Sequence, residues 1–204
     1  AMELGRPFVT WKLATTLDGR SAAADGTSRW VSSLAARRDT HRLRALSDTM
    51  LVGTGTIVED DPQLTVRAAD EKPLERQPLR VVMGERDLDP GRRVFDEAVV
   101  GGSLHLRTRD PRAALAALWE RERRHVFLEG GPTLAAAFLR AGLVDEVVAY
   151  VAPMLLGDGR AAVGELGIES IAAALHLDVT DVRVLEPAAP GEDTNLRITM
   201  RGTA

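Results

Sequence analysis

The chain has 204 residues, of which 45% are hydrophobic and 27% charged, an ordinary composition for a globular protein. Its 26 basic and 30 acidic residues give a formal net charge of −4, which argues against a nucleic-acid partner and means that an anionic ligand needs a local basic cluster. The absence of cysteine excludes disulfides and thiolate metal sites. No apolar run approaches the ~18 residues of a membrane span, and no signal peptide is visible. We therefore expect a cytoplasmic protein with no membrane partner.

The first half of the sequence alternates between predicted strands and helices. Residues 7–14 are rich in β-forming side chains and predict a strand, which is followed by a long polar connection over 21–31. Ser32 or Ser33 is placed to cap a helix from Leu34 to Leu46. Five segments are expected next: a strand at 49–52, a short helix ending at 59–62, an extended segment at 63–67, a surface loop at 68–78 and a strand at 79–83.

The middle of the chain predicts a parallel crossover unit. Asp110 and Pro111 cap and start a helix that runs to Arg121. A strand at 126–129, a helix at 132–141 closed by Gly142 and a strand at 144–151 have the required spacing. The remaining segments are an irregular stretch at 85–102, a short strand at 104–106, a glycine-rich loop at 153–167 and a short helix at 168–174.

The C-terminal residues predict an antiparallel strand pair. Apolar residues alternate over 175–179 and again over 182–184 in the opposite phase, so a β-bulge is expected near Thr180. A last alternating strand covers 196–200, beyond a loop at 187–194. The expected fold class is α/β: a mixed sheet, mostly parallel, with an antiparallel C-terminal strand pair and helices on both faces. We expect residues 1–6 to be a cloning remnant or an interdomain join, and residues 7–204 to form one domain.

A glycine pair follows the buried strand Val126-Phe127-Leu128 and precedes a helix that starts at Pro132. The first N–H groups of such a helix and its dipole favour an anion, so this turn is a candidate phosphate or pyrophosphate site, with Glu129 beside it. The alternative is a tight turn that binds nothing. Glycines also follow the strand at 49–52, although Val58 stands where a dinucleotide fingerprint needs its third glycine.

Six strings in order carry a resemblance to a known family. They are Lys12-Leu13-Ala14-Thr15-Thr16-Leu17-Asp18-Gly19-Arg20, Ser28-Arg29-Trp30, Gly53-Thr54-Gly55-Thr56, Asp60-Asp61-Pro62 with Leu64-Thr65-Val66-Arg67, Glu129-Gly130-Gly131-Pro132-Thr133-Leu134, and Gly142-Leu143-Val144-Asp145-Glu146. Together with the arginine-rich helix that ends in Leu43-Arg44-Ala45, they resemble the riboflavin-pathway pyrimidine reductases. The match is strong over residues 7–160.

The resemblance implies a fold similar to dihydrofolate reductase and the cofactor NADPH. The implied reaction converts 5-amino-6-(5-phosphoribosylamino)uracil to the ribitylamino compound by hydride delivery to ribose C1′. In bacteria the family's reductase is commonly the C-terminal half of a bifunctional protein, whose other half is a zinc deaminase. A homodimer through the C-terminal strands is also implied.

The resemblance also implies a role for each matching residue. The catalytic candidates are Lys12, Asp60 and Glu129, and the substrate-binding candidates are Ser28, Arg44, Leu64, Arg67 and Glu129. The cofactor-binding candidates are Ala14, Trp30, Thr56, Asp60, Gly84, Gly131, Pro132, Thr133, Leu134, Ala135, Ala136 and Ala137.

Several of these residues also have a structural reading. Lys12 lies in an apolar strand and needs a ligand or a carboxylate, for which Asp60 is one candidate. Asp60 could instead end a helix, and Glu129 could cap the glycine turn. Arg44 could be a surface charge. For Arg37, Arg38 and Arg42 a solvated helix face is expected, Arg86 is a candidate reader of a 2′-phosphate, and the four histidines are expected to be satisfied or solvated, with no metal.

Three other functions stay open. A reductase of this fold could act on a pterin or folate, although Arg44 and Arg67 favour a phosphorylated substrate. It could also reduce the undeaminated diaminopyrimidine. The third alternative is a non-catalytic nucleotide-binding module, against which the presence of Lys12, Asp60 and Glu129 speaks.

Overall fold

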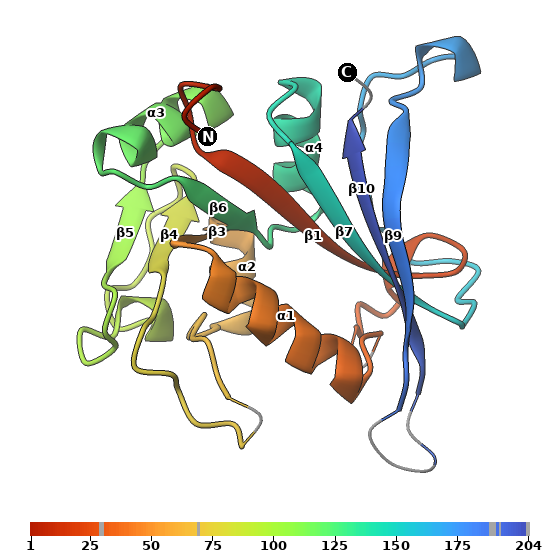
Figure 1. The fold of residues 1–204 in the computed structure, drawn as a ribbon, viewed down its shortest axis with the longest axis horizontal. Helices are drawn as coiled ribbons and strands as arrows, with labels where there is room; N and C mark the ends of the chain where they lie inside the picture. The colour runs from red at the N-terminus through yellow and green to blue at the C-terminus, as the bar shows by residue number, and fades with distance from the viewer. Residues whose placement is uncertain (29–30, 69, 188–190, 192, 203–204) are drawn as a thin grey trace.

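The computed structural model describes residues 1–28, 31–68, 70–187, 191 and 193–202. An eight-stranded sheet runs through it in the order β5-β4-β3-β6-β1-β7-β10-β9 (Figure 1). The strands from β5 to β7 are parallel to one another, and β10 and β9 are antiparallel additions beyond β7, which confirms the expected mixed sheet. Its strands are β1 (Phe8–Thr16), β3 (Thr49–Gly53), β4 (Leu79–Met83), β5 (Ser103–Leu106), β6 (His125–Leu128), β7 (Glu146–Ala152), β9 (Leu177–Leu185) and β10 (Asn195–Gly202).

Helices cover both faces of the sheet, as expected. Neighbouring side chains on a strand point to opposite faces, so Leu51 and Val52 mark the two sides. Leu51 packs in the core under α3 and α4 with Phe138, whereas Val52 packs with Ile57 of α2. On the side of α2, α1 contributes Ala36 to a third cluster. The helices are α1 (Leu34–Leu46), α2 (Thr54–Asp60), α3 (Pro111–Glu120) and α4 (Pro132–Arg140).

Local sequence signals set the ends of these helices. The Ser33 hydroxyl accepts a hydrogen bond from the Ala36 N–H at 3.1 Å and starts α1, and the Asp110 carboxylate caps α3 in the same way. Gly142, with φ of +66°, closes the turn after α4. None of the helices in the described ranges is long and apolar enough to cross a bilayer.

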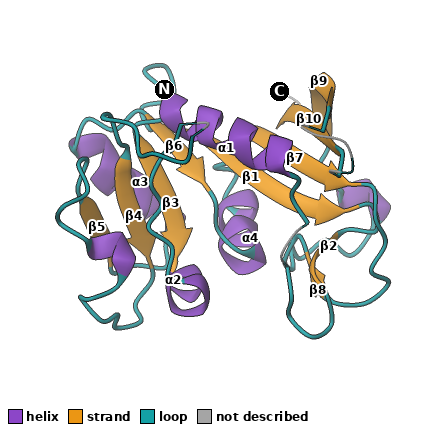
Figure 2. Ribbon diagram, turned by 90° about the horizontal axis from the view of Figure 1, so that it is seen from below, coloured by secondary structure: helices purple, strands orange, loops and turns teal. Residues whose placement is uncertain are grey.

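Several segments differ from the sequence predictions. The connection over 21–31 contains part of β2 (Arg20–Ala22), which pairs with β8 (Arg160–Ala161) (Figure 2). Segment 63–67 is not uniformly extended, because Leu64 has a left-handed φ of 55°. The short helix predicted at 168–174 shrinks to the 3-10 turn η2 (Ile171–Ala173), and a second such turn, η1 (Arg93–Phe95), lies in the stretch expected to be irregular. Much of the predicted loop 187–194 lies outside the described residues.

The predicted bulge in β9 is confirmed. Thr199 pairs with Asp181 and Met200 with Val179, so Thr180 is the extra residue. The bulge corrects the change of phase in the sequence, because the apolar residues on either side of it now share one face of the strand. That face is exposed: Leu177, Val179, Val182 and Val184 are 38–60% accessible.

A polar network holds α1 against the C-terminal part of the sheet. The Tyr150 hydroxyl donates to Asp39 at 2.7 Å, and Arg197 bridges Asp39 at 3.0 Å and Asp181 at 2.8 Å. Asp39 lies on α1, and its partners lie on β7, β10 and β9. The orientation of α1, and with it the position of Arg44 in its last turn, is fixed by these bonds.

Candidate functional site

Glycine-containing turns lie at the carboxyl ends of three adjacent strands, β4, β3 and β6. Gly84 follows β4 with a φ of 139°, and a Cβ there would lie 2.9 Å from the Thr54 hydroxyl. Gly130 follows β6, and a Cβ there would lie 2.6 Å from the side chain of Leu134. Gly53, at the end of β3, faces the same leucine. Close approach of these turns therefore requires glycine at positions 84 and 130.

The start of α4 provides donors at this edge of the sheet. Gly131 is its N-cap, with no side-chain acceptor, and Pro132 occupies the first turn. The first N–H groups of a helix have no partner within it, and they favour an anion. Gly131 and Thr133 are exposed, whereas Ala135 and Ala136 are buried in the packing of α4. Only the first residues of the predicted cofactor-binding segment 131–137 are therefore exposed to a ligand.

A cluster of three charged residues lies beside the glycine turns. Arg44 holds Glu129 with two hydrogen bonds of 2.5 and 2.8 Å, and their side chains are 16% and 10% exposed. Arg44 also donates to the Thr65 carbonyl oxygen at 3.3 Å. It is therefore not the solvated surface charge considered from the sequence. Lys12, on β1, is half-buried on the same side of the sheet, with its ammonium 6.0 Å from the centre of the Tyr150 ring.

Burial and mutual charge set the protonation of this cluster. Burial lowers the pKa of Lys12 and Arg44 lowers it further, while Glu129 opposes them. Burial alone would raise the pKa of Glu129, but Arg44, Lys12 and His41 outweigh it and hold that pKa below its usual value. The carboxylate beside Lys12 is Glu129. Asp60 is exposed at the end of α2, where its charge helps to raise the pKa of Arg160.

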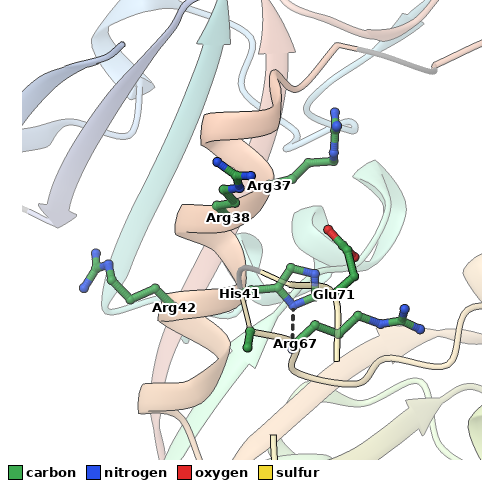
Figure 3. Close-up of a pocket in the computed structure, with 7 residues that line it drawn as sticks. Arg37, Arg38, His41, Arg42, Arg67 and Glu71 are labelled. Atoms are coloured by element: carbon green, nitrogen blue, oxygen red, sulfur yellow. Dashed lines mark hydrogen bonds between the residues drawn. The ribbon is translucent and has the colours of Figure 1, made fainter. Parts of the chain in front are cut away.

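A basic pocket of about 530 Å³ borders this cluster (Figure 3). Its charged lining comes from α1 and from the segment that follows Leu64. The Arg67 N–H donates to Nδ1 of His41 at 3.1 Å, while its guanidinium makes 3.3 Å contacts with Thr65 and Gln63. The residues around the pocket are Arg37, Arg38, His41, Arg42, Arg67, Ala68 and Glu71, so positive charge dominates.

The other predicted site residues are more dispersed. Ser28 is exposed before the undescribed residues, and Trp30, expected to contact the nicotinamide, lies outside the described residues. Thr56 is partly buried in the first turns of α2, and Ala14 is partly buried on β1. Leu64 is buried, with a left-handed backbone.

The histidines are hydrogen-bonded or exposed, as the sequence predicted, and one of them contacts a predicted site residue. His105 contacts the Gly84 carbonyl oxygen at 2.8 Å, His125 contacts the Thr10 hydroxyl at 2.9 Å, and His176 is exposed. His41 is satisfied too, but by the backbone of a predicted substrate-binding residue, Arg67. Among the residues that the structure covers, no group of His, Cys, Asp or Glu could hold a metal ion.

Comparison with known proteins assigns the chain to a family. The family described as "RibD C-terminal domain" matches residues 7–189. The "Riboflavin biosynthesis protein RibD" of Mycobacterium tuberculosis is 51% identical over 183 residues, which are 90% of this chain and 53% of that protein. The RibD of Escherichia coli is 35% identical over 91% of this chain and 59% of its own length. The chain therefore belongs to the RibD C-terminal domain family, and it spans about half the length of these relatives.

Solved structures agree with this assignment. RibD from Acinetobacter baumannii superposes with a TM-score of 0.86 at 32% identity and covers 100% of this chain and 60% of its own. A reductase from Saccharomyces cerevisiae, Rib7, has a TM-score of 0.66 at 17% identity, over 98% of this chain and 91% of its own, which supports the fold alone. The family resemblance seen in the sequence motifs is confirmed.

The buried pair predicts how stability depends on pH. Glu129→Gln leaves Arg44 and Lys12 without their shared negative charge and should lower the free energy of unfolding by about 3 kcal/mol at pH 7. Because the folded-state pKa of Glu129 is lowered, its stabilising contribution is present above its usual value near 4.5 and is lost as the pH falls through the folded-state pKa. Urea unfolding at pH 7 and at pH 3 should therefore show that the wild type and Glu129→Gln differ less in free energy of unfolding at pH 3. Glu120→Gln, at an exposed position, is the control, and equal stability of wild type and Glu129→Gln at pH 7 would contradict the prediction.

Proposed function

We propose that the chain catalyses the NADPH-dependent reduction of 5-amino-6-(5-phosphoribosylamino)uracil to 5-amino-6-(5-phosphoribitylamino)uracil. The observation that carries the proposal is the grouping of Lys12, Arg44 and Glu129 beside the glycine turns, with the basic pocket next to them. Membership of the RibD C-terminal domain family supports it. The site thus combines a place for pyrophosphate, a polar centre and a place for a sugar phosphate.

The glycine turns fit a dinucleotide. The tight contact of Gly130 with Leu134 leaves no room for a side chain, and α4 begins without a side-chain cap. These features suit a cofactor pyrophosphate held by backbone N–H groups. When bound, NADPH supplies the hydride. Gly131, Thr133 and Gly84 are the residues that we expect to hold it, with Asp60 and Thr56 from α2 at the same edge.

Lys12 and Glu129 suit the sugar and the pyrimidine. The ribosylamine must open to an imine before C1′ can accept a hydride, and hydride addition then returns to the amine nitrogen the proton that it lost when the imine formed. The ring oxygen takes up a proton as its bond to C1′ breaks. The lowered pKa of the half-buried Lys12 makes its ammonium a better donor for this proton than an ordinary lysine. Arg44 occupies two of the about four lone-pair directions of Glu129, which leaves others to accept N–H bonds from the pyrimidine.

The half-length match suggests a second component. The aligned part of this chain covers 53% and 59% of the length of two relatives named RibD. We propose that the domain acts beside a zinc deaminase domain that supplies its deaminated substrate.

The reaction can be tested by the loss of nicotinamide absorbance. We expect NADPH to be oxidised when 5-amino-6-(5-phosphoribosylamino)uracil is added, and not when a dihydrofolate substrate is added. Oxidation with the folate alone would move the substrate to that class. Oxidation with the undeaminated diaminopyrimidine alone would place the reduction before deamination. Tight NADPH binding without turnover on any of these substrates would support a binding module instead.

Variants separate turnover from substrate binding. Lys12→Ala or Asp60→Asn should lower kcat by about 100-fold, the effect of losing an acid–base or positioning group, and stability should change much less.

Arg67→Ala should mainly raise KM for the phosphorylated substrate, by about tenfold or more, because a charge-assisted bond is lost. Arg76→Ala is the matched control in an exposed loop. Near-normal kcat in the first two variants, or an unchanged KM in the third, would remove these residues from the site.

We also propose that the chain forms a homodimer through β9. This edge strand presents an exposed apolar face, and the bulge at Thr180 keeps its apolar side chains on that one face. An antiparallel edge is self-complementary about a two-fold axis, and an uncovered apolar face of this kind marks an interaction site.

A single charge tests the dimer. Val182→Glu should convert the wild-type dimer to a monomer in sedimentation-velocity or light-scattering measurements, because it buries an unpaired carboxylate at the interface. Arg183→Glu, on the opposite face of the same strand, is the control and should leave the dimer intact. A monomeric wild type, or a Val182→Glu variant that still dimerises, would refute the interface.

A further inference from the structure

His41 makes a contact that constrains its protonation. Its Nδ1 atom accepts the hydrogen bond of the Arg67 N–H at 3.1 Å. A backbone N–H can only donate, so Nδ1 carries no proton and the single ring proton is on Nε2. His41 lies on α1, one turn before Arg44, and lines the basic pocket (Figure 3). The ring therefore connects the helix that carries Arg44 to the backbone of Arg67.

The backbone around Arg67 is held by two backbone bonds, from the Ala68 N–H to the Lys72 carbonyl oxygen at 2.8 Å and from the Leu74 N–H to the Val66 carbonyl oxygen at 3.0 Å, and by side chains. The Gln77 side chain accepts from the Val66 N–H at 2.7 Å and donates to the Val66 carbonyl oxygen at 2.9 Å, and His41 then holds the next N–H. The guanidinium of Arg67 has only the longer 3.3 Å contacts with Thr65 and Gln63. The direction of this side chain is therefore set mainly by its backbone, and the bond to His41 is the one made by the N–H of Arg67 itself.

We propose that neutral His41 is a positioning residue for the substrate phosphate, acting through the backbone of Arg67. This inference rests on the proposed function, in which Arg67 holds that phosphate. Protonation of Nδ1 replaces an acceptor with a second donor, so the bond to the Arg67 N–H is lost and the backbone that directs the guanidinium is held less firmly. The site then binds the phosphorylated sugar less well in acid.

The surroundings of His41 favour its neutral form. Burial has the largest effect, and Arg44 and Arg67 add to it, while Glu129 and Glu71 oppose it; the net result holds the pKa of His41 below its usual value near 6.5. Arg37, Arg38 and Arg42 also line the pocket. Because the folded pKa is depressed, the neutral ring and its bond persist above pH 6.5 and are lost as the pH falls through the folded-state pKa.

Two substitutions separate the acceptor from the titration. His41→Asn keeps an acceptor near the position of Nδ1 and does not titrate, whereas His41→Leu removes the acceptor. At pH 8 we expect His41→Leu to raise KM for the phosphorylated pyrimidine about fivefold, the effect of one net hydrogen bond, with kcat and the KM for NADPH nearly unchanged. The dephosphorylated pyrimidine should show no such change, and His41→Asn should restore KM. An unchanged KM in His41→Leu would overturn the proposal.

The pH dependence gives a second readout. The ratio of KM in wild type to KM in His41→Asn cancels the titration of the substrate phosphate itself. This ratio should be about one at pH 8 and at pH 6.5, and should rise only as the pH falls through the depressed folded-state pKa, where the wild-type ring becomes protonated. A ratio that falls in acid would show that His41 is a cationic phosphate ligand, and a flat ratio would show that its titration is irrelevant; either result overturns the proposal.

Binding of ribose 5-phosphate keeps the test independent of turnover. If the wild type oxidises no NADPH, the proposed function fails, but calorimetry at pH 8 still compares the wild type with both variants. Weaker binding in His41→Leu alone supports the positioning role, and equal binding in all three proteins overturns it. Nitrogen NMR of the histidine ring should show an unprotonated Nδ1 in the folded protein, and a protonated Nδ1 at pH 8 also overturns it.

Discussion

The bidentate bond between Arg44 and Glu129 is the constraint on which the rest of the site depends. It joins the last turn of α1 to the carboxyl end of β6, with both side chains largely removed from solvent. Buried charges are costly unless they are paired, so moving either residue away would leave the other as an unpaired buried charge. Because Lys12 contributes a second positive charge beside Glu129, the cluster carries an excess of positive charge. A ligand that brings acceptors or negative charge suits such a cluster.

The order of the strands explains how this pair forms. β6 enters the sheet between β3 and β1, so the end of a late strand lies beside the first strand of the chain. Lys12 from β1 and Glu129 after β6 thereby share a site although 117 positions separate them. The network of Asp39, Tyr150 and Arg197 fixes α1 over the same side of the sheet. In open α/β sheets a ligand site forms where neighbouring strand connections run in opposite directions, and this site is placed accordingly.

The parts of the fold that could be predicted from the sequence depend on neighbours along the chain. The side chains of Ser33 and Asp110 accept hydrogen bonds from N–H groups in the first turn of the helix that follows each of them, and the bulge at Thr180 follows from the change in apolar phase. The pairing of Arg44 with Glu129 could not be predicted in this way, because it depends on which strand lies beneath α1. The same is true of His41: its spacing from Arg44 indicates a shared helix face, but not that the backbone of Arg67 lies opposite. Motif resemblance supplied the candidate roles, and the fold supplied their contacts.

Segment 61–67 shows how side chains can replace a regular backbone ladder. Asp61 and Leu64 have left-handed φ values of 40° and 55°, and for a residue such as leucine this conformation costs about 1–2 kcal/mol. The cost is offset by bonds along the segment. The carboxylate of Asp61 accepts the Arg93 N–H, Arg44 donates to the Thr65 carbonyl, the Gln77 side chain brackets Val66, and His41 accepts from Arg67. Since two of these partners lie on α1, the helix that carries Arg44 also orders the segment that carries Arg67. A ligand that uses both arginines then meets a site that is already arranged, which lowers the entropic cost of binding.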